Sequence, residues 1–255
     1  MSEHIQISIA KRVQFLRINR PDRKNALDLS MYKALTDAIR RADSNRNLRV
    51  TVITGAADSF CSGNDIEDFL KGPPADESSP IARFVEALIG TETPTIAAVN
   101  GHAIGIGATM LLHCDLVYAA DGARFQMPFV SIGLCPEAGS SFLLPLLMGH
   151  RQAAEMFYLG KTLSAVEAAR LGLVNAVFPA SQLESEAMEA AEAIAAQPPE
   201  AVRATKRLLR DAFLDAVSAA SRRELQSFLP LLNGPEAREA LSAFMEKREP
   251  DFSRF

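Results

Sequence analysis

The sequence predicts an α/β fold that ends in a helical region. Over about the first 140 of its 255 residues, apolar strand-like segments alternate with loops and helix-like segments, which is typical of a sheet covered by helices. Beyond that point the pattern is nearly all helical, and the last sixty residues carry no strand pattern. We therefore predict a core domain over residues 1–196 and a C-terminal helical region over residues 197–255.

The first elements follow from simple periodicity. Residues 5–9 and 13–18 alternate apolar with polar side chains, which predicts a β-hairpin with one buried face. After a charged loop, Ser30 is expected to cap a helix over residues 31–42, because apolar residues then recur along one helical face.

The middle of the chain predicts buried strands separated by irregular segments. Residues 48–54 form an apolar strand, and an irregular segment over residues 56–80 leads to a predicted helix at 81–89. The next strand, at residues 95–99, feeds a glycine-rich turn. The strand–loop–helix order then repeats, as expected for α/β architecture.

The last core elements and the C-terminal helices have clear start signals. A helix at residues 108–114 and a buried strand at 115–119 follow the glycine turn, and a short strand is predicted at 173–178. Two capping boxes predict further helix starts, Ser164 with Glu167 and Ser181 with Glu184. Pro199 is expected at the first position of a helix, and the Asn-Gly-Pro sequence at residues 233–235 is expected to interrupt it.

Charge and composition exclude several classes of protein. With 27 basic and 31 acidic residues, the formal net charge of −4 provides no basic surface for nucleic acid. No apolar stretch is long enough to span a membrane, and the N-terminus lacks a signal-peptide pattern. The 3 cysteines and 4 histidines show no metal-ligand spacing, so no metal site is expected. These features favour a cytoplasmic protein that binds neither nucleic acid nor membranes.

Three segments carry residues suited to chemistry. Gly101, Gly105 and Gly107 lie between a strand and a helix, without the spacing of dinucleotide or nucleotide-phosphate loops. Free N–H groups at such a helix start could face a developing negative charge, or the glycines could only permit close packing. The loop around Asn64 likewise offers main-chain N–H groups to a ligand, or Asp65 only caps the next helix.

The third segment contains Glu137, a lone carboxylate between apolar stretches. Burial would raise its pKa and suit it to proton transfer near neutral pH. Alternatively, Glu137 is a glutamate in the first turn of a helix, where the helix dipole favours it. The residues alone leave both interpretations open.

Taken together, the segments resemble the enoyl-CoA hydratase/isomerase (crotonase) superfamily. The matching stretches are RINRPDRKNALDLSMYKAL, DSFCSGNDIEDF, AAVNGHAIGIGATMLLHCDLVYA, and the long segment that begins MPFVSIGLCPEAGSS. The resemblance implies a spiral of β-β-α units with a C-terminal helical region that forms a homotrimer or a dimer of trimers. It also implies an acyl-CoA thioester as substrate and no cofactor other than the coenzyme A of the substrate itself.

The resemblance also implies roles for single residues. The main-chain N–H groups of Asn64 and Ile106 would bind the thioester oxygen as an oxyanion hole. Contacts to coenzyme A are implied, mostly through the main chain, for Ala26, Asp65 and Ile66. Lys247 resembles a late lysine that approaches the nucleotide phosphates, although an exposed lysine without such a role is the alternative.

Departures from the family pattern indicate the reaction. Hydratases of the family carry one glutamate where this chain has Thr109, and a second where Pro128 is followed here by Phe129. Glu137 instead stands in P-E-A-G-S-S, which is similar to the segment of peroxisomal-type Δ3,Δ2-enoyl-CoA isomerases that holds their catalytic glutamate. We therefore expect a shift of the double bond from 3-enoyl-CoA to 2-enoyl-CoA. Hydration, ring isomerisation in aromatic-acid breakdown, and a non-catalytic acyl-CoA-binding subunit are the alternatives.

The acyl pocket is expected around Glu137. Phe129, Leu134 and Phe142 are predicted to line it, to raise the pKa of Glu137 and to exclude water from the dienolate. Pocket depth and the segment 70–80 would set the acyl chain length.

Overall fold

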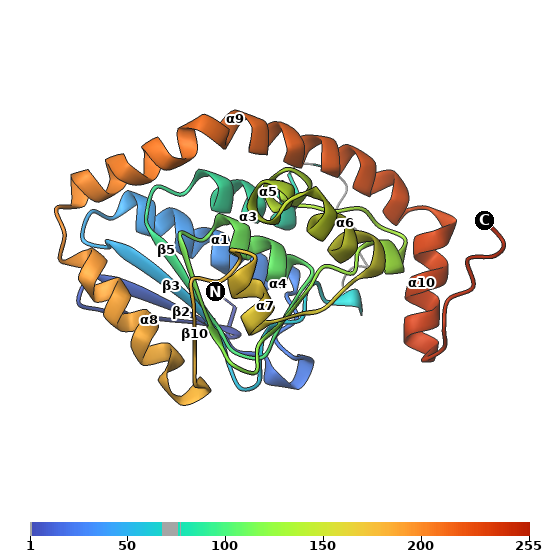
Figure 1. Ribbon diagram of the computed structural model, residues 1–255, viewed down its shortest axis with the longest axis horizontal. Helices are drawn as coiled ribbons and strands as arrows, with labels where there is room; N and C mark the ends of the chain where they lie inside the picture. The colour runs from blue at the N-terminus through green and yellow to red at the C-terminus, as the bar shows by residue number, and fades with distance from the viewer. Residues whose placement is uncertain (1, 68–75, 77) are drawn as a thin grey trace.

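The protein contains two sheets flanked by helices, and the computed structural model describes residues 2–67, 76 and 78–255 (Figure 1). Within these residues the larger sheet has six strands, in the order β1 (Ile5–Ala10), β2 (Val13–Ile18), β3 (Val50–Gly55), β5 (Thr95–Val99), β7 (Leu116–Ala120) and β10 (Ala176–Phe178). The smaller sheet has four, in the order β4 (Ser59–Cys61), β6 (His102–Ile104), β8 (Arg124–Gln126) and β9 (Leu163–Ser164). The predicted α/β class is confirmed. Most of the segment 70–80 lies outside the described residues.

Three successive strands of the larger sheet are each followed by a strand of the smaller one. β3 leads to β4, β5 to β6 and β7 to β8. Neighbouring units pair in parallel in both sheets, β3 with β5 and β5 with β7 in one, β4 with β6 and β6 with β8 in the other. The chain therefore advances by one strand position in each sheet with every turn, which is the predicted spiral of β-β-α units.

The strands of the smaller sheet are not predicted by the sequence. Each is two or three residues long, which is too short to establish a period of two. The residues of β6 are predicted only as part of a glycine turn. The helix predicted over 108–114 is also different, since α4 (Ile106–Thr109) starts two residues earlier and continues as the 3₁₀ helix η2 (Met110–His113).

Helices cover both faces of the larger sheet. α8 (Ala180–Ala195) packs on one face, against alternate strand residues such as Val50, Val52 and Ile96. α1 (Leu29–Ser44) and α3 (Pro80–Gly90) pack on the other, against Ile53 and Val99. Because both faces are covered, β3 and β5 are buried along their whole length, as is usual for parallel strands.

The first helix has a different cap from the one predicted. Asp28, rather than Ser30, caps α1, because its Oδ1 accepts a hydrogen bond from the Met31 N–H at 2.9 Å. Ser30 lies in the first turn and donates its hydroxyl proton to Asp28. Aspartate and serine are about equally good caps, so the sequence does not distinguish two candidates that lie two residues apart.

One of the two predicted capping boxes is present. Ser164 and Glu167 form it at the start of α7 (Ala165–Arg170). The box predicted for Ser181 and Glu184 is wrong, since α8 already begins at Ala180 and Glu184 pairs with Arg17 at 2.8 Å.

The C-terminal part of the chain is helical, as predicted. Its remaining helices are α5 (Ser140–Met148), α6 (His150–Leu159), α9 (Pro199–Leu232) and α10 (Pro235–Glu246). Two short 3₁₀ helices, η1 (Pro21–Arg23) and η3 (Val130–Ile132), lie earlier in the chain. Pro199 opens α9 and the break at 233–235 separates α9 from α10, as predicted. The strand predicted at 173–178 is reduced to β10.

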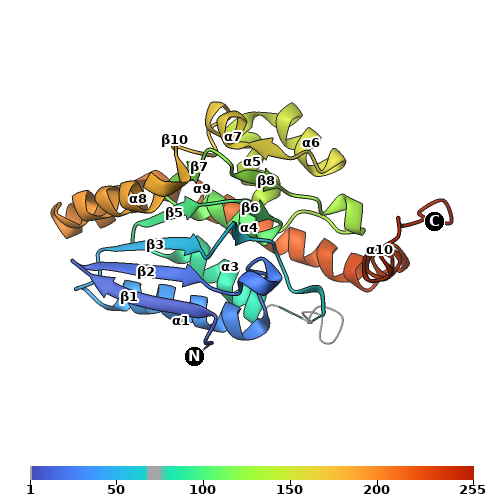
Figure 2. The ribbon, with the colours of Figure 1, turned by 90° about the horizontal axis from the view of Figure 1, so that it is seen from below.

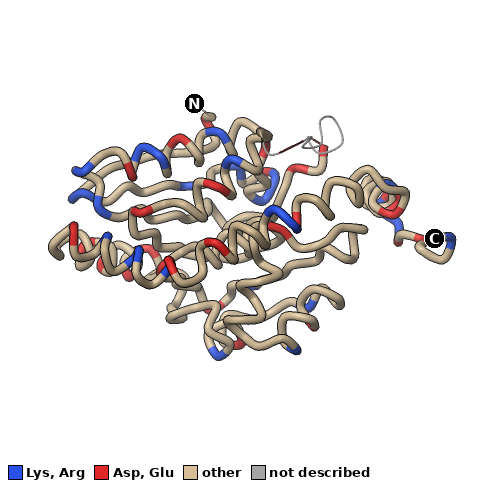
Figure 3. Tube along the Cα trace, turned by 90° about the horizontal axis from the view of Figure 1, so that it is seen from above, with Lys and Arg blue, Asp and Glu red and all other residues tan. Residues whose placement is uncertain are grey.

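The long helix α9 extends across the molecule, and α10 lies beyond one end of it (Figures 1 and 2). The predicted domain boundary at residue 196 falls between α8 and α9, and the division into two domains remains a prediction. Acidic and basic residues are both distributed over the helices and turns (Figure 3). None of the helices in the described part of the chain is long and apolar enough to cross a membrane.

Candidate active site

The loop that follows β4 directs one main-chain N–H away from its neighbours. Asn64 forms an isolated parallel bridge with Leu27. Leu27 donates to the Gly63 carbonyl at 2.8 Å, and Asp65 donates to the Leu27 carbonyl at 2.9 Å. Because these bonds flank Asn64, its own N–H points to the opposite side, and no acceptor for it is found among the described residues.

A buried tyrosine orients the Asn64 side chain. The Tyr32 hydroxyl, on α1, donates to Asn64 Oδ1. The Tyr32 ring is buried and lies edge-on to Phe84 of α3, with 5.4 Å between ring centroids. Burial raises the pKa of Tyr32 well above its usual value, so the hydroxyl stays protonated and remains a donor. This contact was not predicted, because the sequence around Tyr32 does not distinguish it from an ordinary core residue.

The second N–H is that of Ile106, the first residue of α4. Gly105 precedes it with φ 57° and ψ −123°, a conformation that favours glycine. The Ile106 N–H has no carbonyl one helical turn earlier to bond, and no acceptor for it occurs in the part of the chain that the structure describes. The N-terminus of α4 thus offers a free donor, as the first of the two interpretations of the glycine motif expects.

Glycines bring the two donor loops together. A Cβ added to Gly105 would lie 3.9 Å from the Gly63 Cα, so the turns that carry Ile106 and Asn64 are neighbours. A Cβ added to Gly107 would lie 2.3 Å from the Cys61 carbonyl oxygen. Close packing and donor exposure are therefore two consequences of the same glycines.

Glu137 lies in the turn before α5. Its Oε1 accepts a hydrogen bond from the Thr109 hydroxyl at 2.8 Å. Burial and, to a smaller extent, the negative charge of Glu224 raise the pKa of Glu137 to about 7, against the opposing effect of the Thr109 hydrogen bond. Because α5 begins only at Ser140, the alternative of a first-turn helix glutamate is wrong.

The turn that holds Glu137 is fixed from two sides. Ala138 and Gly139 both have left-handed backbone conformations, with φ 58° and φ 72°. The Ala138 carbonyl accepts a hydrogen bond from Nε2 of His113 at 2.7 Å. Burial lowers the pKa of His113 to about 4, so the ring is neutral and Nε2 carries its proton. On the other side, Glu224 of α9 accepts from the Gly139 N–H at 2.5 Å.

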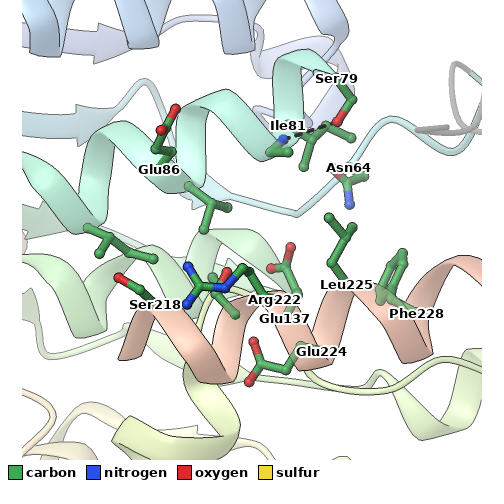
Figure 4. Close-up of a pocket in the computed structure, with 15 residues that line it drawn as sticks. Asn64, Ser79, Ile81, Glu86, Glu137, Ser218, Arg222, Glu224, Leu225 and Phe228 are labelled. Atoms are coloured by element: carbon green, nitrogen blue, oxygen red, sulfur yellow. Dashed lines mark hydrogen bonds between the residues drawn. The ribbon is translucent and has the colours of Figure 1, made fainter. Parts of the chain in front are cut away.

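A cavity of about 320 Å³ joins Asn64 to Glu137. It lies between α3 and α9, and Figure 4 shows Glu137 at the space between these two helices. Its walls combine apolar residues with serines and charged groups, namely Ser79, Ile81, Ala82, Val85, Glu86, Ile89, Ala138, Ser218, Ser221, Arg222, Glu224, Leu225 and Phe228. The Asn64 loop and Glu137 therefore face one space.

The predicted acyl-pocket residues lie elsewhere. Phe129 and Leu134 are buried in the main core, and Phe142 packs against that core, but none of the three lines the cavity. Its apolar walls come instead from α3 and α9, for example Val85 and Phe228. The sequence gives no signal for this, because α9 reads as part of a separate helical region.

The predicted coenzyme A segment packs against the Asn64 loop. Arg20 forms an ion pair with Asp65 at 2.7 Å, and Arg20 also donates to the Ala26 carbonyl at 3.2 Å. Asp65 in addition accepts from the Glu67 N–H at 2.9 Å, as its predicted capping role requires. Ile66 is half-buried beside it. Arg20 thus links its segment to the Asn64 loop through Asp65, and the contacts of Ala26, Asp65 and Ile66 to coenzyme A remain predictions.

Lys247 is exposed at the C-terminus of α10, where it has a left-handed backbone conformation. It does not line the cavity. Its predicted contact with the nucleotide phosphates stays a prediction.

Comparison with known protein families identifies one match over most of the chain. A sequence model of the enoyl-CoA hydratase/isomerase family matches residues 8–254. The crystal structure of an enoyl-CoA hydratase/isomerase from Pseudoalteromonas atlantica T6c superposes with a TM-score of 0.94 at 42% identity, covering 98% of this chain and all of that one. This similarity confirms the crotonase-like fold.

Two curated relatives of similar identity have different activities. Enoyl-CoA delta isomerase 2 of Rattus norvegicus is 34% identical over 97% of this chain, which spans 64% of that longer protein. The 2,3-dehydroadipyl-CoA hydratase of Escherichia coli K12 is 35% identical, with 99% of both chains covered. Identity alone therefore does not distinguish isomerisation from hydration.

Proposed function

Because this chain belongs to the enoyl-CoA hydratase/isomerase family, we propose that it moves the double bond of a 3-enoyl-CoA to the conjugated 2-position. The observation that carries the proposal is the environment of Glu137. It is a carboxylate in the cavity whose raised pKa of about 7 allows it both to accept and to return a proton near neutral pH. The rat relative, an enoyl-CoA delta isomerase, also supports the proposal.

The proposed mechanism needs two main-chain donors and one carboxylate. The N–H groups of Asn64 and Ile106 bind the thioester oxygen, which makes the C2 protons more acidic. Glu137 removes one C2 proton, and the electrons of that C–H bond form a dienolate whose charge lies on the thioester oxygen. The same carboxyl group returns the proton to C4, so the double bond moves from C3–C4 to C2–C3. Each oxyanion donor is worth about 2.7–4 kcal/mol at the transition state.

Efficient hydration would need a second acid/base group near Glu137. The neighbouring Thr109 is a hydroxyl that already donates to Glu137. Glu224 also lines the cavity, but its two oxygens accept the main-chain N–H groups of Gly139 and Ser141. Glu86 is paired with Arg40. Among the residues that the structure describes, the groups near Glu137 thus support a single-carboxylate reaction.

The direct test is to mix the protein with a trans-3-enoyl-CoA and follow the ultraviolet absorbance of the conjugated thioester. A parallel reaction starts from a 2-enoyl-CoA and measures its loss by hydration. Rising conjugation with little hydration supports the proposal. Steady loss of 2-enoyl-CoA without isomerisation would establish a hydratase and contradict it. Absence of both reactions, with tight acyl-CoA binding, would indicate a binding subunit.

The rate of isomerisation is expected to depend on pH through Glu137. The carboxylate is the active base, and its folded-state pKa is about 7. Activity should therefore be low at pH 5.5, rise through pH 7 and level off above pH 8. The measurement is kcat/KM for 3-enoyl-CoA between pH 5 and pH 9. An ordinary glutamate, with a pKa near 4.5, would give a flat profile over this range and contradict the assignment.

The proposal includes coenzyme A only as part of the substrate and a homotrimer or a dimer of trimers as the assembly. Exposed apolar residues on the C-terminal helices support an oligomer, for example Leu208, Leu209 and Phe213 on α9. Apolar side chains of this size are rarely left in contact with water in groups. Within such an assembly, we propose that Lys247 contacts the phosphates of coenzyme A.

A further inference from the structure

We propose that Glu224 of α9 is a positioning residue: its hydrogen bonds fix the turn that holds Glu137, and its carboxylate places a buried negative charge beside that turn. The inference rests on the proposed function, since it assigns Glu137 as the catalytic base. Glu224 lies 87 residues further along the chain, in the helical region that the sequence separates from the core. No motif marks it, because Arg-Arg-Glu-Leu within a helix resembles a solvated face.

Glu224 joins α9 to the start of α5 through two hydrogen bonds. Its carboxylate accepts from the Gly139 N–H at 2.5 Å and from the Ser141 N–H at 2.8 Å. Both N–H groups belong to the start of α5, where no carbonyl of the same helix is available. Glu224 is 6% exposed, and a buried carboxylate of this kind is stabilised by two charge-assisted hydrogen bonds. The turn and the helix therefore stabilise each other.

The turn itself needs outside support. Ala138 has φ 58°, which is unfavourable for a residue with a Cβ, and Gly139 follows with φ 72°. Val217 of α9 lies against Gly139, where an added Cβ would be 2.9 Å from its Cγ1. Because these residues follow Glu137 directly, their backbone conformation sets the position of its carboxylate.

Glu224 also differs in charge from the other groups around Glu137. Tyr32 of α1 and the thiols of Cys61 and Cys135 are neutral near pH 7, because burial raises their pKa values. Glu86 of α3 is paired with Arg40, and Arg222 of α9 is exposed to solvent. Among the described ionisable residues around Glu137, Glu224 is the buried charge, and it raises the pKa of Glu137.

Two variants separate the hydrogen bonds from the charge. Glu224→Gln keeps the shape, removes the charge and places a donor against one of the two N–H groups. Glu224→Asp keeps the charge but is too short to reach both. The matched control is Glu200→Gln on the same helix, an exposed residue paired with Arg46 and about 36 Å away along the helix axis.

Three measurements on the full-length protein test the proposal. In Glu224→Gln, kcat should fall on the order of tenfold or more, since a small displacement of a catalytic group has large effects. The acid limb of its pH–rate profile should move to lower pH. Hydrogen exchange at residues 138–141 should become faster, and alkylation of Cys135 should become faster at a fixed pH, because Glu224 also raises the pKa of that thiol.

Glu224→Asp should show faster exchange and a lower kcat with the acid limb retained, and Glu200→Gln should match the wild type. If Glu224→Gln does not fold, Glu224→Asp still decides the hydrogen-bonding role. Unchanged exchange and an unmoved acid limb in Glu224→Gln would overturn the proposal, as would a lower kcat with an unmoved limb. Hydrogen exchange and alkylation need no substrate. They therefore still test whether Glu224 fixes the turn at residues 138–141 if the wild type does not isomerise 3-enoyl-CoA.

Discussion

Replacing Glu137 by glutamine is expected to reduce isomerase activity by about 10²–10⁴-fold, the usual contribution of a general acid/base. Glutamine has nearly the same shape and can still accept from the Thr109 hydroxyl, but it cannot take the C2 proton. The main-chain donors at Asn64 and Ile106 are unaffected by the change. The measurement is kcat with 3-enoyl-CoA, together with the dissociation constant of a saturated acyl-CoA, which should remain close to that of the wild type.

The control for this substitution is Glu200→Gln, which makes the same change at an exposed position on α9. It should leave kcat and binding unchanged. If Glu137→Gln retains most of the wild-type rate, another group must remove the proton and the mechanism is wrong. If the variant loses acyl-CoA binding to the same extent as activity, Glu137 has a structural role instead.

Replacing Gly107 by alanine should disturb the oxyanion hole at the start of α4 while leaving the Glu137 side chain itself in place. The new Cβ would lie 2.3 Å from the Cys61 carbonyl oxygen and 2.9 Å from the Cys61 Cβ, so backbone on one side must move. We expect the start of α4 to shift, and with it the Ile106 N–H. We expect kcat to fall by about 10²–10³-fold, as when one oxyanion donor is removed.

The measurement is kcat together with the thermal unfolding midpoint and the circular dichroism spectrum. Gly122→Ala is the matched control, because a Cβ at that position meets nothing within 4 Å and its φ is not positive. It should behave as the wild type. Full activity in Gly107→Ala would show that the α4 N-terminus does not supply the donor.

Local patterns in the sequence account for most of the larger sheet and its helices. The β1–β2 hairpin, the buried strands β3 and β5, and the start of α9 at Pro199 all follow from periodicity and terminal residues. The strands of the smaller sheet do not, because two or three residues are held in place by their neighbours rather than by their own pattern. The cap of α1 is a related case, because aspartate and serine are about equally good capping residues and the sequence pattern pointed to Ser30 rather than Asp28.

Some residues of the candidate site can likewise be identified in the sequence, and others only in the structure. Glu137 and the loops around Asn64 and Gly105 are identified in the sequence by the family resemblance, since spacing alone leaves a purely structural role open for each of them. The cavity walls on α3 and α9 cannot be found in this way, since Phe129, Leu134 and Phe142 are equally apolar but do not line the cavity. Hydrophobicity predicts that a residue is buried and does not predict which side of a packed layer it faces.

The sequence by itself therefore determined the α/β class and the family, and through the family resemblance it predicted Glu137 as the acid/base residue, because these depend on patterns within short segments. The tertiary structure decided that Thr109 is the hydrogen-bond partner of Glu137, that burial brings its pKa to about 7, and that Glu224 holds its turn. Each of these depends on contacts between residues far apart in the chain, such as 28 positions for Thr109 and Glu137 and 85 for Gly139 and Glu224, where only the packing of the folded protein sets distance and solvent access.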